Sequence, residues 1–135
     1  MGERGKSDEA RVDARGIRPA RVYAIEERPA PSGVVVLALS GEFDLASIPS
    51  AREHFEQVRA RRPRGVVLDL SEVTFADSSA LRELLRHDAG LREDGARLVL
   101  AAPSAAVERL LELTRARELL DVAPTVERAL DRVGR

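Results

Sequence analysis

The sequence predicts an α/β fold: a single domain on a mostly parallel sheet of four to five strands, with an antiparallel strand at one edge and about four flanking helices. Several short apolar runs are continuous, as in strands that are buried on both faces. These runs alternate with stretches of helical spacing about 10 to 15 residues long, which suit crossovers between parallel strands. The expected order is β-β-α-β-α-β-α-β-α.

The first elements are an edge strand, a central strand and a helix. Residues 21–26 alternate loosely and predict the edge strand, and residues 33–39 form an apolar run typical of a buried strand. Residues 41–44 are interpreted as the next loop. Ser47 is placed as the cap of a helix whose first turn holds Pro49. The expected inward face of this helix consists of Ile48, Ala51, Phe55 and Val58.

The middle elements repeat this alternation. Residues 66–70 predict a second central strand, and residues 97–101 predict a third. The helix between them is expected to run to about Asp94, where Gly95 ends it. Its inward face is expected to hold Leu81, Leu84, Leu85 and Leu91.

Two more helices and a short strand complete the expected fold. Ser104 is expected to cap the first of these helices. Its inward residues are expected to be Val107, Leu110, Leu111 and Thr114. Residues 119–122 predict a short last strand, and Pro124 and Thr125 open a closing helix. The inward residues of that helix are expected to be Val126, Ala129, Leu130 and Val133.

Composition narrows the class of protein. Aromatic residues make up only 3% and tryptophan is absent, so stacking platforms for single-stranded nucleic acid are not expected. The net charge of -1 gives no basic footprint for DNA and no polybasic membrane anchor. Cysteine is absent, which excludes disulfides and thiolate catalysis. Residues 1–18 are rich in charge and are expected to be a mobile tail, with the domain spanning residues 19–135. A cytoplasmic protein is expected.

The segment VTFADSSALRELL (residues 73–85) places a carboxylate and two hydroxyls at a strand-to-helix junction. Asp77, Ser78 and Ser79 follow an apolar run, and a helical pattern begins at once. Aspartate and serine favour helix N-caps, which accounts for one or two of the three residues. Asp44 follows the neighbouring strand. Because parallel strands present their carboxyl ends at one edge, both features are expected to lie there.

Enzymatic alternatives find little support. A serine nucleophile needs a base within hydrogen-bond reach, yet His87 lies eight residues after Ser79 on the same helix, about 12 Å along its axis. Both His54 and His87 are interpreted as surface residues. No G-x-S-x-G elbow, P-loop, D-x-D strand end or G-x-G-x-x-G is present. Asp44 and Asp77 alone are weak evidence for Mg²⁺. We therefore expect a protein that is not an enzyme and holds no metal or cofactor.

Three segments carry a resemblance to a known family. They are VVVLALSGEFDLAS, VVLDLSEVTFADSSALRELL and GARLVLAAPSAAVERLLELT, in that order. Together they resemble a STAS domain over about residues 20–133, and most closely the bacterial anti-sigma factor antagonists of the SpoIIAA type. The fold of that family matches the one expected from the residue pattern.

The resemblance implies a partner and a switch. It implies that an anti-sigma factor serine kinase binds the protein and uses ATP to phosphorylate Ser79. Asp44, Asp77 and Ser78 match the rest of the family's motifs, which implies that they contribute to partner binding, and Arg82 adds a charge to that face. Phosphate is expected to release the partner and so to regulate sigma-factor-dependent transcription. A PP2C-type phosphatase would reset the switch.

The sequence departs from the family pattern at three places. Ala80 and Arg82 stand where the family usually has glycine, and residues 114–116 replace a common T-G-L turn. Ala80 is expected to alter how closely a kinase approaches. These departures fit an alternative role, that of a constitutive STAS adaptor subunit in a stress-signalling or lipid-transport complex.

Overall fold

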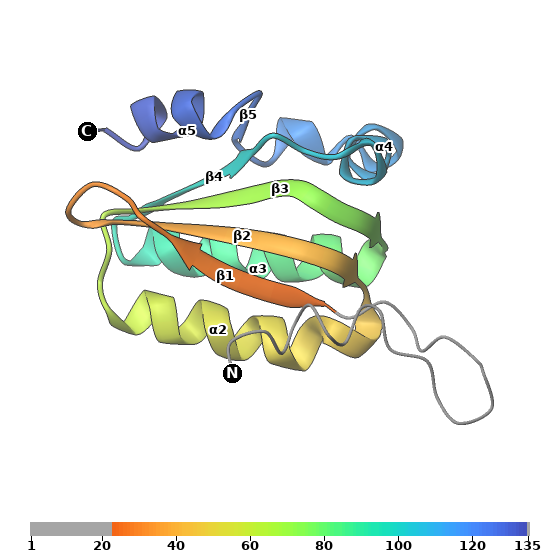
Figure 1. Cartoon of the computed structure of the whole chain (residues 1–135), viewed down its shortest axis with the longest axis horizontal. Helices are drawn as coiled ribbons and strands as arrows, with labels where there is room; N and C mark the ends of the chain where they lie inside the picture. The colour runs from red at the N-terminus through yellow and green to blue at the C-terminus, as the bar shows by residue number, and fades with distance from the viewer. Residues whose placement is uncertain (1–22, 135) are drawn as a thin grey trace.

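A computed structural model describes residues 23–134, and a five-stranded sheet forms its centre (Figure 1). The strands are β1 (Ala24–Arg28), β2 (Val34–Phe43), β3 (Gly65–Ala76), β4 (Arg97–Ala101) and β5 (Val122–Ala123). They lie in chain order, and β1 pairs antiparallel with β2 while the other pairs are parallel. The expected tail, residues 1–18, and the start of the expected edge strand lie outside the described residues.

Within residues 23–134, four α-helices and two short 3-10 helices join the strands. The helices are α2 (Ile48–Ala60), α3 (Ser78–Glu93), α4 (Ala105–Thr114) and α5 (Val126–Arg132), with η1 (Leu45–Ser47) and η2 (Ala116–Glu118). In Figure 1, α2 and α3 lie on one side of the sheet and α5 lies on the other. The α/β fold expected from the sequence is therefore confirmed, including the antiparallel edge strand.

The core has one hydrophobic cluster on each face of the sheet. Successive residues of β3 alternate between them: Val66 and Leu68 join the cluster under α2 and α3, while Val67 joins the cluster under α5. Burying each such side chain contributes about 1.5 to 3 kcal/mol. The apolar runs are continuous because the central strands are covered on both faces. The closing helix packs as expected, with Ala129 and Val133 buried in the second cluster.

The two longest strands extend beyond their predicted ends. β2 continues to Phe43 and β3 to Ala76, so the interpretation of residues 41–44 as a loop was wrong for all but Asp44. In this extension the buried Phe43 follows the half-buried Glu42, which is the pattern of a strand covered on one face. Parallel pairing persists to the end, where Phe43 is opposite Ala76.

Several local expectations were also wrong. Ser47 occupies the N-cap position of α2, but its side chain bonds to Asp44 instead of an α2 N–H group. Thr114 is exposed and donates from its hydroxyl to the carbonyl of Leu110 at 2.6 Å. The last strand is limited to Val122–Ala123, and η2 precedes it. Arg115 ends α4 with a φ of 60°, a left-handed cap that favours glycine.

Candidate functional site

The carboxyl ends of β2 and β3 bring the predicted site residues together. Because Phe43 is opposite Ala76, the next residues, Asp44 and Asp77, leave neighbouring strands at the same level. Each aspartate is an N-cap, of η1 and of α3 respectively. We call residues 44–47 and 77–82 the strand-end edge. Figure 1 shows both turns at the same end of the sheet, next to the arrowheads of β2 and β3.

The Asp44 turn is fixed by reciprocal hydrogen bonds. Oδ1 of Asp44 accepts from the N–H groups of Ala46 at 3.1 Å and Ser47 at 3.2 Å. Oγ of Ser47 accepts from the N–H of Asp44 at 2.9 Å, and its hydroxyl donates to the Asp44 carbonyl at 3.0 Å. This is a capping box, which satisfies N–H groups at both of its positions. The turn therefore holds its carboxylate in a fixed place.

The Asp77 turn presents two free hydroxyls. Oδ1 of Asp77 accepts from the N–H of Ala80 at 3.1 Å, which starts α3. Ser78 is exposed and Ser79 is half-buried, and they are the first two residues of the helix. Neither hydroxyl has a hydrogen-bond partner within residues 23–134. Both oxygens are therefore free to react at a helix N-terminus, where the dipole favours an added negative charge.

Ala80 and Arg82 differ in where their side chains lie. Ala80 is fully buried, and its methyl group belongs to the core cluster under α2 and α3. The effect of Ala80 on the approach of a kinase stays a prediction, and a direct contact through this buried methyl group is not part of it. Arg82 is exposed, one turn further along α3.

Two large apolar side chains are exposed beside these turns. Leu45, which follows Asp44, is 70% exposed, and Phe75, which lies two residues before Asp77, is 48% exposed. Sequence reasoning missed both residues, since Leu45 was counted only as part of a connection and Phe75 only as part of an apolar run.

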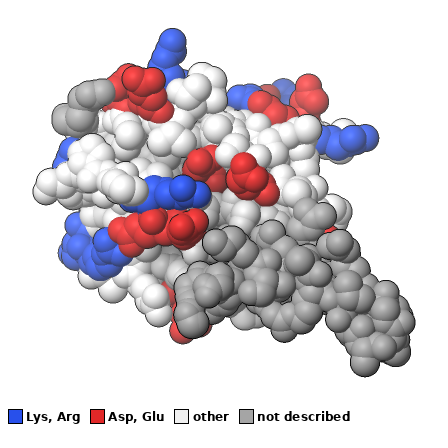
Figure 2. All heavy atoms as spheres, in the orientation of Figure 1, with Lys and Arg blue, Asp and Glu red and all other residues white. Residues whose placement is uncertain are grey.

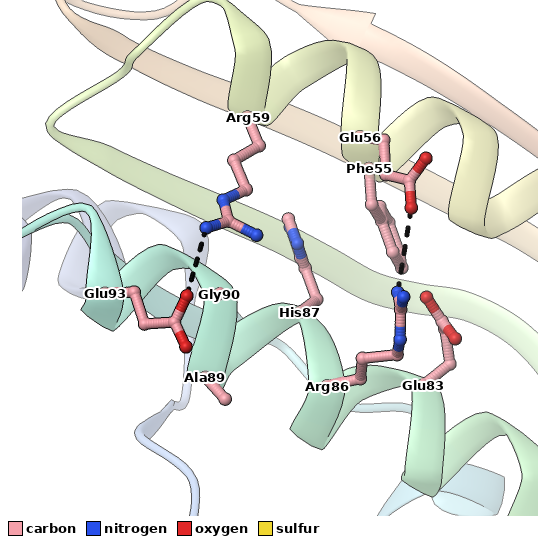
Figure 3. Close-up of a pocket in the computed structure, with 9 residues that line it drawn as sticks. All are labelled: Phe55, Glu56, Arg59, Glu83, Arg86, His87, Ala89, Gly90 and Glu93. Carbon is pink, nitrogen blue, oxygen red and sulfur yellow. Dashed lines mark hydrogen bonds and ion pairs between the residues drawn. The ribbon is translucent and has the colours of Figure 1, made fainter.

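A second candidate site is the hollow between α2 and α3, of about 290 Å³ (Figure 3). Phe55 of α2 and His87 of α3 stack there, with ring centroids 4.3 Å apart and planes 8° apart. His87 is only 5% exposed, and its Nε2 has no hydrogen-bond partner. Burial, and secondly the charge of Arg59, lowers the pKa of His87 to about 4. The interpretation of His87 as a surface residue was wrong, whereas His54 is exposed.

The charged groups around this hollow are paired with one another. Arg86 lies 3.7 Å from Glu56 across the two helices, and Arg59 lies 3.4 Å from Glu93 (Figure 3). Gly90 allows the Arg59 guanidinium to approach, since a Cβ there would lie 2.6 Å from its Nη1. The ring contact of His87 is with Phe55, so it forms no pair with either serine. The hollow is a helix-packing interface with its charges satisfied.

Residues 23–134 show no metal site and no membrane-spanning helix. No group of three or more histidine, cysteine, aspartate or glutamate side chains there is placed to hold a metal ion. Figure 2 shows basic and acidic side chains interspersed on the face it presents. No helix in this part of the chain combines the length and apolar character needed to cross a membrane.

The chain belongs to the STAS domain family. The family model matches residues 27–129, a range that runs from the end of β1 into α5 and contains β2 to β5 and α2 to α4 in full. A STAS-domain containing protein of Pseudomonas aeruginosa (strain UCBPP-PA14) is 33% identical over 103 residues, which are 74% of this chain and 99% of that protein.

Solved structures place the chain beside anti-sigma factor antagonists. One from Mycobacterium paratuberculosis has a TM-score of 0.75 and 28% identity, covering 83% of this chain and 94% of its own. Unphosphorylated SpoIIAA has a TM-score of 0.68 and 23% identity over 82% of this chain and 96% of its own. Phosphorylated SpoIIAA of Bacillus has a TM-score of 0.63 and 22% identity over 82% and 99%. The two SpoIIAA structures share the fold of this chain.

Proposed function

We propose that the protein is a cytoplasmic anti-sigma factor antagonist whose binding is switched by phosphorylation of Ser79. In its unmodified form it binds an anti-sigma factor serine kinase and so frees a sigma factor for transcription. Transfer of phosphate from ATP to the Ser79 hydroxyl then releases the kinase, and a PP2C-type phosphatase restores the serine. The observation that carries this proposal is the Ser79 hydroxyl, which lies at the start of α3 beside the Asp44 turn and has no partner among residues 23–134.

The comparisons support the class of function. The antagonist of Mycobacterium paratuberculosis is 28% identical and covers most of the chain. SpoIIAA is described as an anti-sigma factor antagonist and is known in unphosphorylated and phosphorylated forms. This chain shares the family and the fold, and its own serine pair at the start of α3 has no hydrogen-bond partner within residues 23–134, which supports the same kind of switch.

The fold tolerates phosphate at this position. To no acceptor in residues 23–134 does the Ser79 hydroxyl donate a hydrogen bond that phosphorylation would remove. Its place in the first turn of α3 puts an anion where the helix dipole and the orphan N–H groups favour it. Asp77 keeps its bond to Ala80, so the cap that starts the helix remains. We therefore expect the phosphorylated chain to stay folded.

The interface is where phosphate has its effect. Phosphorylation adds a charge of about -2 at neutral pH. Repulsion from one partner carboxylate about 6 Å away is on the order of 1.4 to 5.5 kcal/mol for effective dielectric constants of about 80 to 20. A loss of ~1.4 kcal/mol in binding free energy lowers affinity tenfold, so one such repulsive contact is enough to release a partner. Exposed Leu45 and Phe75 supply apolar contact area for the unmodified complex.

Phosphorylation is tested with the cognate kinase. The full chain is incubated with the kinase and ATP, and mass spectrometry locates the phosphate; Ser79→Ala is compared with the matched variant Ser78→Ala. We expect one phosphate per chain, loss of labelling in S79A and retention of labelling in S78A. Full labelling of S79A would show that the site is wrong.

The partner is tested by a pull-down from the native host, with and without ATP. We expect a small kinase that is retained without ATP and released with it. Recovery of an ABC-type ATPase or of a large homomeric complex would contradict the proposal and assign the alternative adaptor role.

A further inference from the structure

Among the arginines of α3, Arg82 is the one without a carboxylate partner in the described part of the chain. Arg86 pairs with Glu56 (Figure 3), with 3.7 Å between the two charged groups, and Arg92 donates to Asp88 at 2.9 Å. Within residues 23–134, Arg82 makes no ion pair or hydrogen bond through its side chain. It is exposed on the second turn of α3. A free guanidinium therefore lies close to the two free hydroxyls.

The spacing on the helix brings Arg82 within reach of both serines. Arg82 follows Ser78 by four residues and Ser79 by three, and side chains with these spacings are neighbours on a helix surface. Helical side chains also lean toward the N-terminus, so a long side chain covers the turn that precedes its own Cα. The guanidinium of Arg82 can thus reach a phosphate on the first turn of α3 without a change in the backbone.

We propose that Arg82 is an internal clamp for the phosphate on Ser79. Two phosphate oxygens accept charge-assisted hydrogen bonds from its guanidinium, which suits such paired contacts. This inference rests on the proposed function and adds a second element to the switch. Phosphorylation then changes the strand-end edge twice: it adds negative charge, and it withdraws the free cation of α3 from the surface offered to a partner.

Asp44, Asp77 and Arg52 do not compete with Arg82 for the phosphate. Asp44 and Asp77 carry negative charge and repel phosphate. Arg52 of α2 donates to Oε1 of the buried Glu83 at 2.8 Å, so that pair is already formed. Of these charged groups, all within residues 23–134, Asp44 and Asp77 repel the phosphate and unpaired Arg82 attracts it, so a contact with Arg82 offsets part of the repulsion.

The clamp is tested on full-length protein that carries phosphoserine at position 79, installed during translation. Phosphorus NMR follows the second pKa of the phosphate, which is about 6 in the absence of a partner. A helix ion pair of about 0.3 to 0.5 kcal/mol lowers that pKa by about 0.2 to 0.4 unit. We expect Arg82→Gln to raise the pKa by that amount and Arg82→Lys to recover most of the shift. Arg86→Gln is the matched control, with an expected shift below about 0.1 unit.

The result separates this inference from the proposed function. Equal phosphate pKa values in the parent chain and in R82Q would overturn the clamp, and so would equal shifts in R82Q and R86Q. The phosphate is present without any kinase, so the measurement does not depend on labelling. A chain that the kinase does not label would overturn the proposed function while the titration still reports on Arg82.

Discussion

The strand-end edge and the hollow between α2 and α3 share a helix but differ in how their polar groups are satisfied. Along the hollow, Glu83 bonds to Arg52 and Arg86 lies beside Glu56. At the strand-end edge, Ser79 and Arg82 have no partner in the described part of the chain. Most of α3 therefore packs against α2 and the sheet, whereas its first turns keep the unpaired polar side chains that the proposed interface would use. Changes in the hollow should therefore alter folding, and changes at the edge should alter binding.

Replacing Phe55, which is buried in the hollow, should have the largest effect on the stability of the fold. Phe55 is 2% exposed and stacks on His87, so Phe55→Ala leaves a cavity in the core. We expect a loss of about 4 kcal/mol in the free energy of unfolding, measured by denaturant titration. Where the variant is still folded, its affinity for the partner should not change. A loss below about 1 kcal/mol would contradict this account of the hollow.

Low pH should lower the stability of the fold, because His87 becomes protonated. Its pKa is lowered to about 4 in the folded chain, from 6.5 when unfolded. The unfolded state therefore binds a proton first, so stability is complete above pH 6.5 and declines as pH falls toward 4, by on the order of 3 kcal/mol. His87→Phe keeps the ring and should remove this slope in unfolding titrations. His54→Gln, at an exposed site, should leave it unchanged; a slope that persists in H87F would contradict the assignment.

Loss of the α3 cap should have a moderate effect. Asp77→Ala removes the acceptor of the Ala80 N–H, which should cost about 1 kcal/mol of stability in thermal or denaturant unfolding. Asp77→Asn is the matched control, since its side-chain oxygen can still accept that bond. We expect D77N to stay within about 0.5 kcal/mol of the parent chain. Equal losses in both variants would show that charge, and not the cap, holds this turn.

Changing Arg82 in the unmodified chain should have the smallest effect. Arg82→Gln removes an exposed, unpaired charge, so stability should stay within about 0.5 kcal/mol. Affinity for the partner, measured by calorimetry, should fall by about twofold to fivefold, as for a surface ion pair of ~0.4 to ~1 kcal/mol. Unchanged affinity in R82Q would place Arg82 outside the interface.

The central strands could be predicted from the sequence because their signal is local. The run at Val66, Val67 and Leu68 is apolar at every position, which only burial on both faces requires. The ends of β2 and β3 could not be placed in the same way. Beyond Leu39 the strand is covered on one face, and the half-buried Ser40 and Glu42 resemble a loop in sequence.

At the candidate site, sequence reasoning located the turns but not the state of each side chain. It placed Asp44 and Asp77 at one edge because parallel strands end together. It missed the burial of His87, although its spacing from Leu84 and Leu91 puts it on the inward face of α3. The burial of Glu83 depends on Arg52, which lies 31 positions earlier on α2. A contact between two helices leaves no local signal in either segment.

Under the proposed function, phosphate on Ser79 decides whether the partner stays bound. The most direct measurement compares the affinity of the anti-sigma factor for the unmodified chain and for the same chain with phosphoserine at position 79. We expect phosphoserine to reduce the affinity by at least about tenfold, which corresponds to ~1.4 kcal/mol. Both chains should be equally folded. Equal affinity for the two chains would contradict it.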